Sequence, residues 1–195
     1  MSSHHFVREG QEPALLILEA TSYSHAEGLL EWAPLVIVTE AALEEVLLWG
    51  IKIDVVIALP QNRQDLTSRL ADQAPIKIFS AGDDLIEASL LFISGAGQNA
   101  LSILAEDFPD MLRGKIEQFA GKIQVTVRTS DHKWSWIQSG QFKKWFQRGS
   151  VVDFSMSGPS ATIKASRLPD SGYELTEDQW ITIENPSSFW ISEQL

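Results

Sequence analysis

The sequence predicts an α/β protein with two parts: an N-terminal α/β domain with a mostly parallel sheet, followed by a C-terminal antiparallel β-sandwich domain. In the first part, continuous apolar runs alternate with helical patterns, which is typical of strands buried on both faces of a parallel sheet. From Lys122 onward, short segments rich in β-branched and aromatic residues follow one another with turn residues between them. We therefore expect domains at 1–121 and 122–195.

The centre of the first domain reads as strand, helix and strand. LVIV (35–38) is a continuous apolar run, AALEEVLLWG (41–50) is a helical pattern that Gly50 ends, and IDVVIAL (53–59) is a second apolar run. Parallel sheets bind ligands outside the carboxyl ends of their strands. Thr39, Glu40 and the residues from Ala58 to Asn62 therefore line the predicted cleft.

The flanking segments extend this alternation on both sides. A strand at 13–20 and a helix at 22–32 come before the central unit, and a helix at 63–73 and a strand at 75–80 come after it. Four strands and three helices in strict alternation are characteristic of a mostly parallel sheet.

The next segment is harder to assign. SLLFIS (89–94) follows Asp83 and Asp84 too closely to leave room for a helical crossover, so we expect it to pair antiparallel or to form an irregular connection. We expect Gly95 and Gly97 to precede an apolar helix. That layout either cradles an anion at the helix N-terminus or is a turn that needs glycine for its backbone conformation. A helical connector at 107–121 completes the domain.

Composition excludes several classes of function. A formal net charge of −11 argues against a nucleic-acid or anionic-membrane partner. The absence of cysteine excludes disulfides and thiolate metal sites. No apolar run approaches the roughly 20 residues that span a bilayer, and the N-terminus lacks a signal-like pattern, so we expect a cytoplasmic protein.

The segment GIKIDVVIALPQ (50–61) resembles the central motif of the thiamin pyrophosphokinases, in which Gly-Ile-Lys-x-Asp precedes a strand that runs into Gly-Asp-Phe-Asp-Ser. The opening residues 1–18, GQFKKW at 140–145 and RGS at 148–150 resemble the form found in Bacteroidetes-type bacteria. The resemblance implies a catalytic-type α/β domain, a thiamin-binding-type β-sandwich domain and a homodimer. It also implies pyrophosphate transfer from ATP to thiamin with Mg²⁺.

The sequence departs from this family where the chemistry is concentrated. The two acids of Gly-Asp-Phe-Asp-Ser fall on Leu59 and Gln61, and Mg²⁺ is usually held through carboxylates and substrate phosphates. The family's Asp-His pair falls on Gln98 and Asn99, and its Ser-Asn-Glu segment has no counterpart. These losses indicate a catalytically degenerate homologue.

The resemblance and the predicted cleft together give the candidate site residues. Glu40 and Asp84 are the candidate catalytic carboxylates. The candidate ligand-binding residues are Glu40, Gln61, Asn62, Asp83, Asp84, Gln98 and Asn99. A rebuilt metal site would draw on Glu40, Asp65 and either Asp83 or Asp84. Alternatively, Asp65 belongs to the first turn of a helix, where its charge complements the helix dipole.

Five of the seven tryptophans lie in the second domain. They are Trp134, Trp136, Trp145, Trp180 and Trp190. They either form the inner layer of the sandwich or a dimer interface, or one of them stacks on a planar heterocycle.

Two functions remain open at this point. The first is a degenerate homologue that binds a small molecule, thiamin-like or a nucleotide, or that binds a partner protein, and needs no cofactor. The second is an active enzyme that uses Mg²⁺ and ATP to transfer pyrophosphate to thiamin or a related alcohol. Convergence of Glu40, Asp65 and Asp83 or Asp84 favours the enzyme, and their dispersal favours the binding protein.

Overall fold

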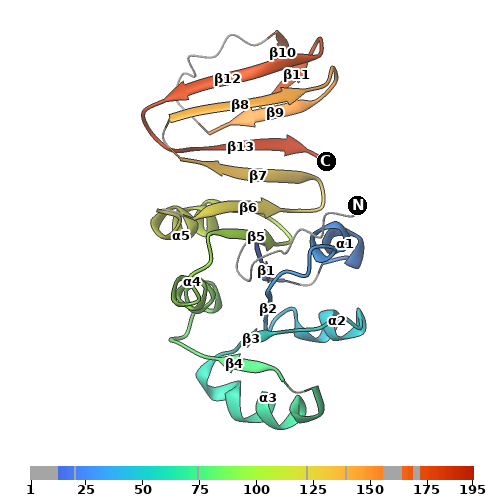
Figure 1. Cartoon of the computed structure of the whole chain (residues 1–195), viewed down its shortest axis with the longest axis vertical. Helices are drawn as coiled ribbons and strands as arrows, with labels where there is room; N and C mark the ends of the chain where they lie inside the picture. Colours follow the sequence, from blue (N-terminus) through green and yellow to red (C-terminus); the bar gives the residue numbers. More distant parts are fainter. Residues whose placement is uncertain are drawn as a thin grey trace, which may run out of the picture. The chain divides into compact units, whose positions relative to one another are not determined.

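The computed structural model describes residues 13–19, 21–73, 75–121, 123–138, 140–155, 164–168 and 172–195. The chain divides into two units, Met1–Ser130 and Asp131–Leu195 (Figure 1). The part of the family resemblance that falls on residues 1–12 lies outside the described residues. None of the helices in the described part of the chain combines the length and the apolar character that a membrane-spanning helix requires.

The first unit is a parallel sheet with helices on both faces. Its elements in chain order are β1 (Ala14–Ile17), α1 (Tyr23–Leu30), β2 (Val36–Thr39), α2 (Leu43–Leu48), β3 (Val55–Ile57), α3 (Arg63–Arg69), β4 (Lys77–Phe79), α4 (Leu85–Gly95), β5 (Ala100–Leu104), α5 (Asp110–Phe119) and β6 (Gln124–Arg128). Short 3₁₀ turns lie at Pro60–Asn62 and Ala71–Gln73.

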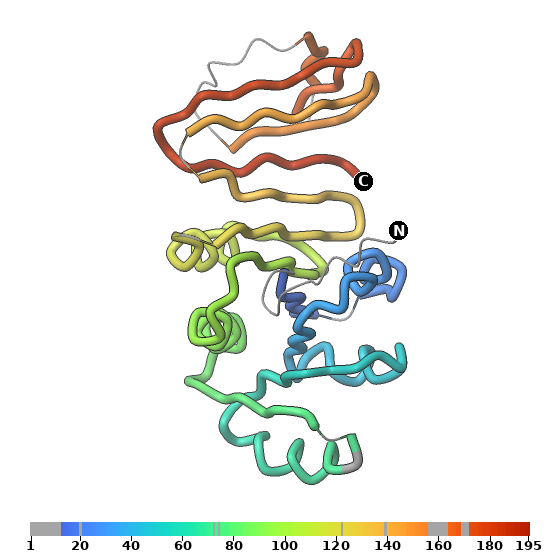
Figure 2. The backbone as a smooth tube through the Cα atoms, in the orientation of Figure 1, coloured from blue at the N-terminus to red at the C-terminus, as the bar shows by residue number. Residues whose placement is uncertain are grey.

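Every strand pairing in this sheet is parallel, in the order β6-β5-β1-β2-β3-β4. Figure 2 follows the backbone outward from β1 to β4 and then back to β5 and β6 on the other side of β1. The carboxyl ends of β1, β2, β3 and β5 therefore meet along one edge, with β1 near the middle.

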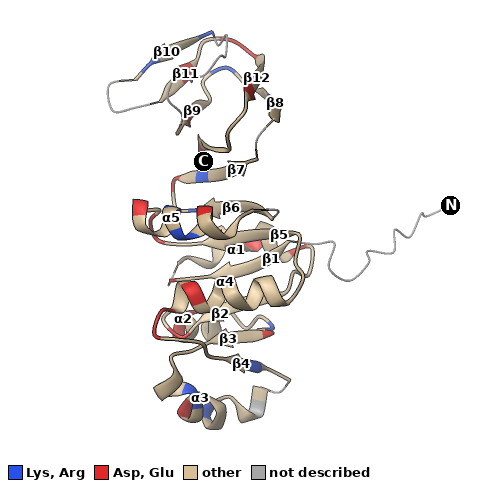
Figure 3. Cartoon of the chain, turned by 90° about the vertical axis from the view of Figure 1, so that its left-hand side faces the viewer, with Lys and Arg blue, Asp and Glu red and all other residues tan. Residues whose placement is uncertain are grey.

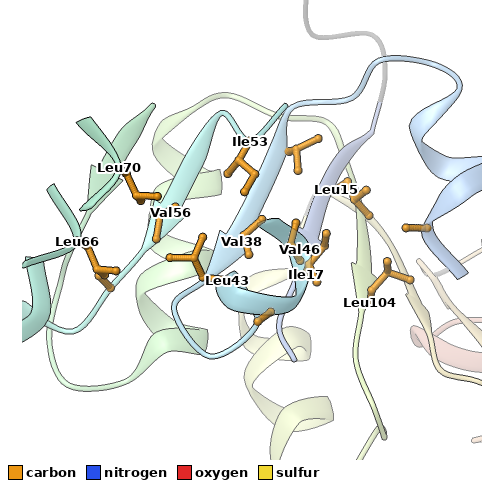
Figure 4. Packing of buried hydrophobic residues seen from close by; sticks show 14 residues of the cluster. Leu15, Ile17, Val38, Leu43, Val46, Ile53, Val56, Leu66, Leu70 and Leu104 are labelled. Carbon is orange, nitrogen blue, oxygen red and sulfur yellow. The ribbon is translucent and has the colours of Figure 1, made fainter. Parts of the chain in front are cut away.

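The apolar runs form this sheet because both of its faces are covered. On one face, alternate residues of the central strands pack against side chains from α1, α2 and α3, as Figure 4 shows for Leu15, Ile17, Val38, Leu43 and Val46. The intervening residues Leu16 and Ile37 point to the other face and are fully buried as well.

The assignment of SLLFIS as a strand or irregular connection is wrong. These residues belong to α4, whose buried positions are Ala88, Ser89, Leu90 and Ile93. A short apolar run cannot be told from a buried helix by its pattern alone. The strand that follows is instead ALSIL, which was expected to be a helix and forms β5.

The assignment of QVTVR to the antiparallel domain is also wrong. This segment is β6, and it pairs parallel with β5, with Leu101 opposite Val125 and Ile103 opposite Val127. Its alternating burial resembles that of a half-exposed antiparallel strand, although α5 makes it the end of a βαβ crossover. The first unit accordingly ends at Ser130, beyond the boundary expected at residue 121.

The second unit contains only strands among its described residues. They are β7 (His132–Ile137), β8 (Gly140–Phe146), β9 (Val151–Phe154), β10 (Ala165–Arg167), β11 (Tyr173–Leu175), β12 (Gln179–Asn185) and β13 (Phe189–Gln194). The strands β10-β11-β9-β13-β7 lie in one sheet and β12-β8 in another, and all of these pairings are antiparallel.

Side chains from both sheets of this unit form one buried cluster. Phe146 comes from β8, Ile181 and Ile183 from β12, and Phe154 and Ile191 from the larger sheet. The segments therefore alternate inward apolar and outward residues, as expected for packed antiparallel sheets.

The tryptophans of the second unit have different surroundings. Trp190 is fully buried and packs on Trp136 with ring centroids 5.1 Å apart. Trp145 and Trp180 lie opposite each other on β8 and β12, and both are exposed. One pair thus contributes to packing, and the other forms an aromatic surface.

Candidate functional site

A cavity of about 380 Å³ lies at the carboxyl edge of the parallel sheet. Its walls come from the residues that follow β1, β2, β3 and β5 and from the first turns of α4 and α5. The lining residues are Leu18, Glu19, Thr39, Ala41, Leu59, Asp83, Asp84, Leu85, Ile86, Asp107, Pro109, Met111 and Leu112. We call this the carboxyl-edge cavity.

A second hollow of about 320 Å³ shares Ala41 and Leu85 with this cavity. Its other lining residues are Glu40, Leu43, Glu44, Asn62, Asp65, Leu66 and Arg69. The residues expected at the cleft are thus divided between two hollows: Thr39 and Leu59 line the first, and Glu40 and Asn62 line the second. Ala58, Pro60 and Gln61 line neither hollow.

Glu40 is held by the turn that follows β3. One carboxylate oxygen accepts a hydrogen bond from the backbone N–H of Leu59 at 3.2 Å, and the other accepts one from the side-chain amide of Asn62 at 3.0 Å. The backbone N–H of Glu40 in turn donates a hydrogen bond to the backbone carbonyl of Ile57 at 2.8 Å. Glu40 therefore ties the end of β2 to the turn that follows β3.

Asp84 is also held by its own surroundings. It is the N-cap of α4, and one carboxylate oxygen accepts hydrogen bonds from the backbone N–H groups of Ile86 and Glu87, both at 2.9 Å. The other oxygen accepts a hydrogen bond from the ammonium of Lys115 on α5, which also lies 3.4 Å from Glu87. Asp84 thereby begins one helix and joins it to another.

These contacts change the acidity of both partners. Partial burial by itself raises the pKa of Asp84, but the hydrogen bonds from Lys115 and from the N–H of Glu87 outweigh it, and the pKa lies below its ordinary value. The hydrogen bond to Asp84 raises the pKa of Lys115. Both groups are therefore charged at neutral pH.

The remaining acids proposed for a metal site line different hollows. Asp65 is in the first turn of α3, 4.0 Å from Arg69, which also pairs with Glu44. Asp65 lines the second hollow, and Asp83 lines the carboxyl-edge cavity. Within the described part of the chain, no group of three or more His, Asp or Glu side chains is arranged to hold a metal ion.

Gln98 and Asn99 lie at the opposite edge of the sheet. They precede β5, and the carbonyl of Asn99 accepts the N–H of Gln124 at the start of β6. Gly95 ends α4 and Gly97 follows it with a φ of 68°, so the expected helix N-terminus here is in fact a helix C-terminus. Of the two interpretations of these glycines, the structure supports the conformational turn.

Three residues that contribute to the site were not singled out by the sequence. Glu19 and Asp107 follow the carboxyl ends of β1 and β5, and both line the carboxyl-edge cavity. A correct assignment of β5 would have indicated Asp107. Lys115 carries no sequence signal, because only the packing of α5 beside α4 brings it to Asp84.

Comparisons with known proteins show similarity at the level of structure. No protein-family model and no curated protein sequence matches the chain. Thiamine pyrophosphokinase from Bacillus subtilis superposes with a TM-score of 0.66 at 12% identity, over 93% of this chain and 98% of that chain. Thiamin pyrophosphokinase from Candida albicans gives a TM-score of 0.66 at 9% identity, over 94% of this chain and 90% of that chain.

Thiamin pyrophosphokinase from yeast gives a TM-score of 0.63 at 6% identity, over 94% of this chain and 86% of that chain. The similarity thus extends over nearly the whole of each chain, although few residues are shared. The protein has the fold of the thiamin pyrophosphokinases.

Proposed function

We propose that this protein is a relative of the thiamin pyrophosphokinases that binds a small ligand in the carboxyl-edge cavity and transfers no pyrophosphate. The observation that carries the proposal is the environment of Glu40. The turn beside it has Leu59 and Gln61 where the resemblance expects acids, and Glu40 itself bonds to Leu59 and Asn62 through both of its oxygens. Glu40 therefore stabilises the turn after β3 through its side chain.

The other carboxylates support the same conclusion. Phosphoryl transfer depends on metal ions and cationic groups that neutralise and position the phosphates. Asp84 is neutralised by Lys115, and Asp65 lies near Arg69, which is itself paired with Glu44. These contacts engage Lys115 and Arg69 together with two of the acids proposed for a rebuilt metal site, Asp84 and Asp65.

The alternative is an active Mg²⁺-dependent transferase with a rebuilt metal site. Asp83 and Asp107 favour it, because both line the cavity and neither side chain has a hydrogen bond or ion pair within the described residues. Such a site would hold Mg²⁺ through these two carboxylates and the phosphates of ATP.

The homodimer and the cytoplasmic location that we expect belong to this proposal as well. The exposed Trp145 and Trp180 are compatible with a protein interface, because aromatic residues are enriched there. Their surface is the place to look for a partner protein.

The test is calorimetric titration with a non-hydrolysable ATP analogue and Mg²⁺, then with thiamin, followed by an assay for thiamin diphosphate. We expect no product from the natural chain. The double variant L59D/Q61D, which places acids at both positions, is the matched comparison. Formation of thiamin diphosphate by the natural chain would overturn the proposal and would direct mutagenesis to Asp83 and Asp107.

A further inference from the structure

We infer that the carboxyl-edge cavity takes a protonated amine carried on an apolar body. The inference rests on the proposed function, because it takes this cavity to be the ligand site. It adds the chemical class of the ligand, which differs from the polyphosphate of a nucleotide in the sign of its charge.

The cavity offers an apolar wall for the body of such a ligand. Leu18 and Leu112 are each only 5% exposed, and Leu59, Leu85 and Ile86 add further apolar side chains to the lining. Met111 stands at the rim and is 67% exposed, and a methionine side chain adapts its shape to what it contacts. A volume of about 380 Å³ is within the range of small-molecule sites.

The charged groups of the lining are all acidic. They are Glu19, Asp83, Asp84 and Asp107, and no Lys or Arg is among the described residues that line the cavity. Lys115 offsets Asp84 from outside the lining. Figure 3 shows acidic residues in red and basic residues in blue. The remaining negative charge attracts a cation and repels an anionic ligand.

Two of these carboxylates are exposed and accept no hydrogen bond from the protein within the described residues. The side chains of Asp83 and Asp107 have no partner within the described residues. Glu19 accepts the backbone N–H of Glu106 at 3.1 Å through one oxygen, which leaves its other oxygen available. Glu40 and Asp84 differ from them, because both of their oxygens already accept hydrogen bonds.

Carboxylate oxygens that accept no hydrogen bond from the protein distinguish a protonated amine from a quaternary ammonium. A protonated amine donates hydrogen bonds as well as carrying charge, and charge-assisted hydrogen bonds are about twice as strong as neutral ones. A quaternary ammonium on the same body supplies the charge without the N–H donors and is larger by three methyl groups. The acceptors of Asp83 and Asp107 therefore match the amine better.

The test uses four probes that share one phenyl body: 2-phenylethylamine, its N,N,N-trimethyl analogue, 2-phenylethanol and 3-phenylpropanoate. Binding to the full chain is followed by NMR titration. We expect the amine to bind most tightly, the quaternary ion less tightly, and the alcohol about tenfold more weakly than the amine. The carboxylate should not bind. Raising the salt concentration should weaken binding of the amine and leave the affinity for the alcohol unchanged.

The matched variants are D83N and D107N, alone and together. The double variant should bind the amine about tenfold more weakly and bind the alcohol as the natural chain does, which also verifies that the cavity is intact. E27Q is the control, because Glu27 is an exposed acid on α1 that does not line the cavity. It should change neither affinity.

Several results would overturn the inference. If the quaternary ion binds as tightly as the amine, the N–H donors do not contribute to binding. An alcohol that binds as tightly as the amine, or a carboxylate that binds at all, removes the role of the charge. An equal loss in E27Q and in the double variant removes the role of Asp83 and Asp107.

Failure of this inference is distinguishable from failure of the proposed function. Formation of thiamin diphosphate refutes the proposed function whatever the amine does. Absence of product together with preference for the carboxylate refutes the ligand class alone.

Discussion

Two corners of the parallel sheet use a carboxylate in different ways. At the corner between β2 and β3, Glu40 accepts hydrogen bonds from neutral donors of the following turn. At the start of α4, Asp84 accepts two backbone hydrogen bonds from its own helix and one from the ammonium of Lys115 on α5. The first corner ties a turn to a strand, and the second ties two helices together through charge.

The comparison teaches that an acid at the carboxyl edge of a parallel sheet does not by position alone serve a ligand. Both residues were candidates for catalysis or ligand binding on sequence grounds, and in the structure both brace the backbone around the cavity. Asp83 and Asp107 lie at the same edge without such partners. What separates the two groups is the set of donors that packing brings to each carboxylate.

The largest effect is expected for D84A, which removes the N-cap of α4 and the partner of Lys115. Loss of the cap costs about 0.5–2 kcal/mol, and loss of the partly exposed ion pair adds at most about 1 kcal/mol. Urea unfolding measures the sum. D84N is the matched control, because asparagine caps about as well as aspartate. If D84N is as destabilised as D84A, the cap is not the main contribution.

E40A is expected to cost less, about 1 kcal/mol, because it leaves the partly buried N–H of Leu59 without its acceptor. E40Q keeps one acceptor oxygen and should fall between E40A and the natural chain. The same urea titration applies. If E40A is as stable as the natural chain, the hydrogen bonds of Glu40 do not stabilise the turn after β3.

The stability difference between the natural chain and D84N should depend on pH. Because the pKa of Asp84 is lower in the folded than in the unfolded chain, the carboxylate stabilises the fold above the unfolded pKa of about 3.9. That contribution is lost as the pH falls through the lower folded pKa. Thermal unfolding at pH 7 should separate the two proteins, and the gap should narrow as the pH falls below the unfolded pKa of Asp84. A constant gap would contradict the role of the charge.

The smallest effect on stability is expected for D83N. Asp83 is exposed and its side chain has no partner within the described residues, so the substitution should change the free energy of unfolding by less than about 0.5 kcal/mol. The comparison with D84N, at the adjacent position and with the same chemical change, isolates the effect of Lys115. A loss in D83N as large as in D84A would mean that Asp83 also supports the fold.

Local pattern was sufficient to predict much of the first unit. The segment from β2 to β3 and the helix α3 follow from apolar runs, a glycine at the helix end and the alternation of elements. The same rules place the ends of β2 and β3 at one edge. The strands of the second unit also follow from alternation, with antiparallel pairing as expected.

Local pattern failed where the same residues fit two structures. SLLFIS is apolar enough for a strand, but the N-cap at Asp84 and burial on one face of α4 decide for a helix. QVTVR alternates like an antiparallel strand, and only its pairing with β5 makes it parallel. In QVTVR a partner distant in the sequence outweighed local preference, and in SLLFIS the helix cap and the packing of α4 did so.

The sequence by itself determined the class of fold and the edge of the sheet where a cleft would form, and its resemblance to the thiamin pyrophosphokinases predicted that Leu59 and Gln61 stand where acids are expected. Only the tertiary structure decided which acids remain available there. Glu40 meets Asn62 and Asp84 meets Lys115, while Asp83 and Asp107 meet no partner within the described residues. The physical reason is that the role of a carboxylate depends on the donors within hydrogen-bond reach, and chain folding assembles those donors from distant segments.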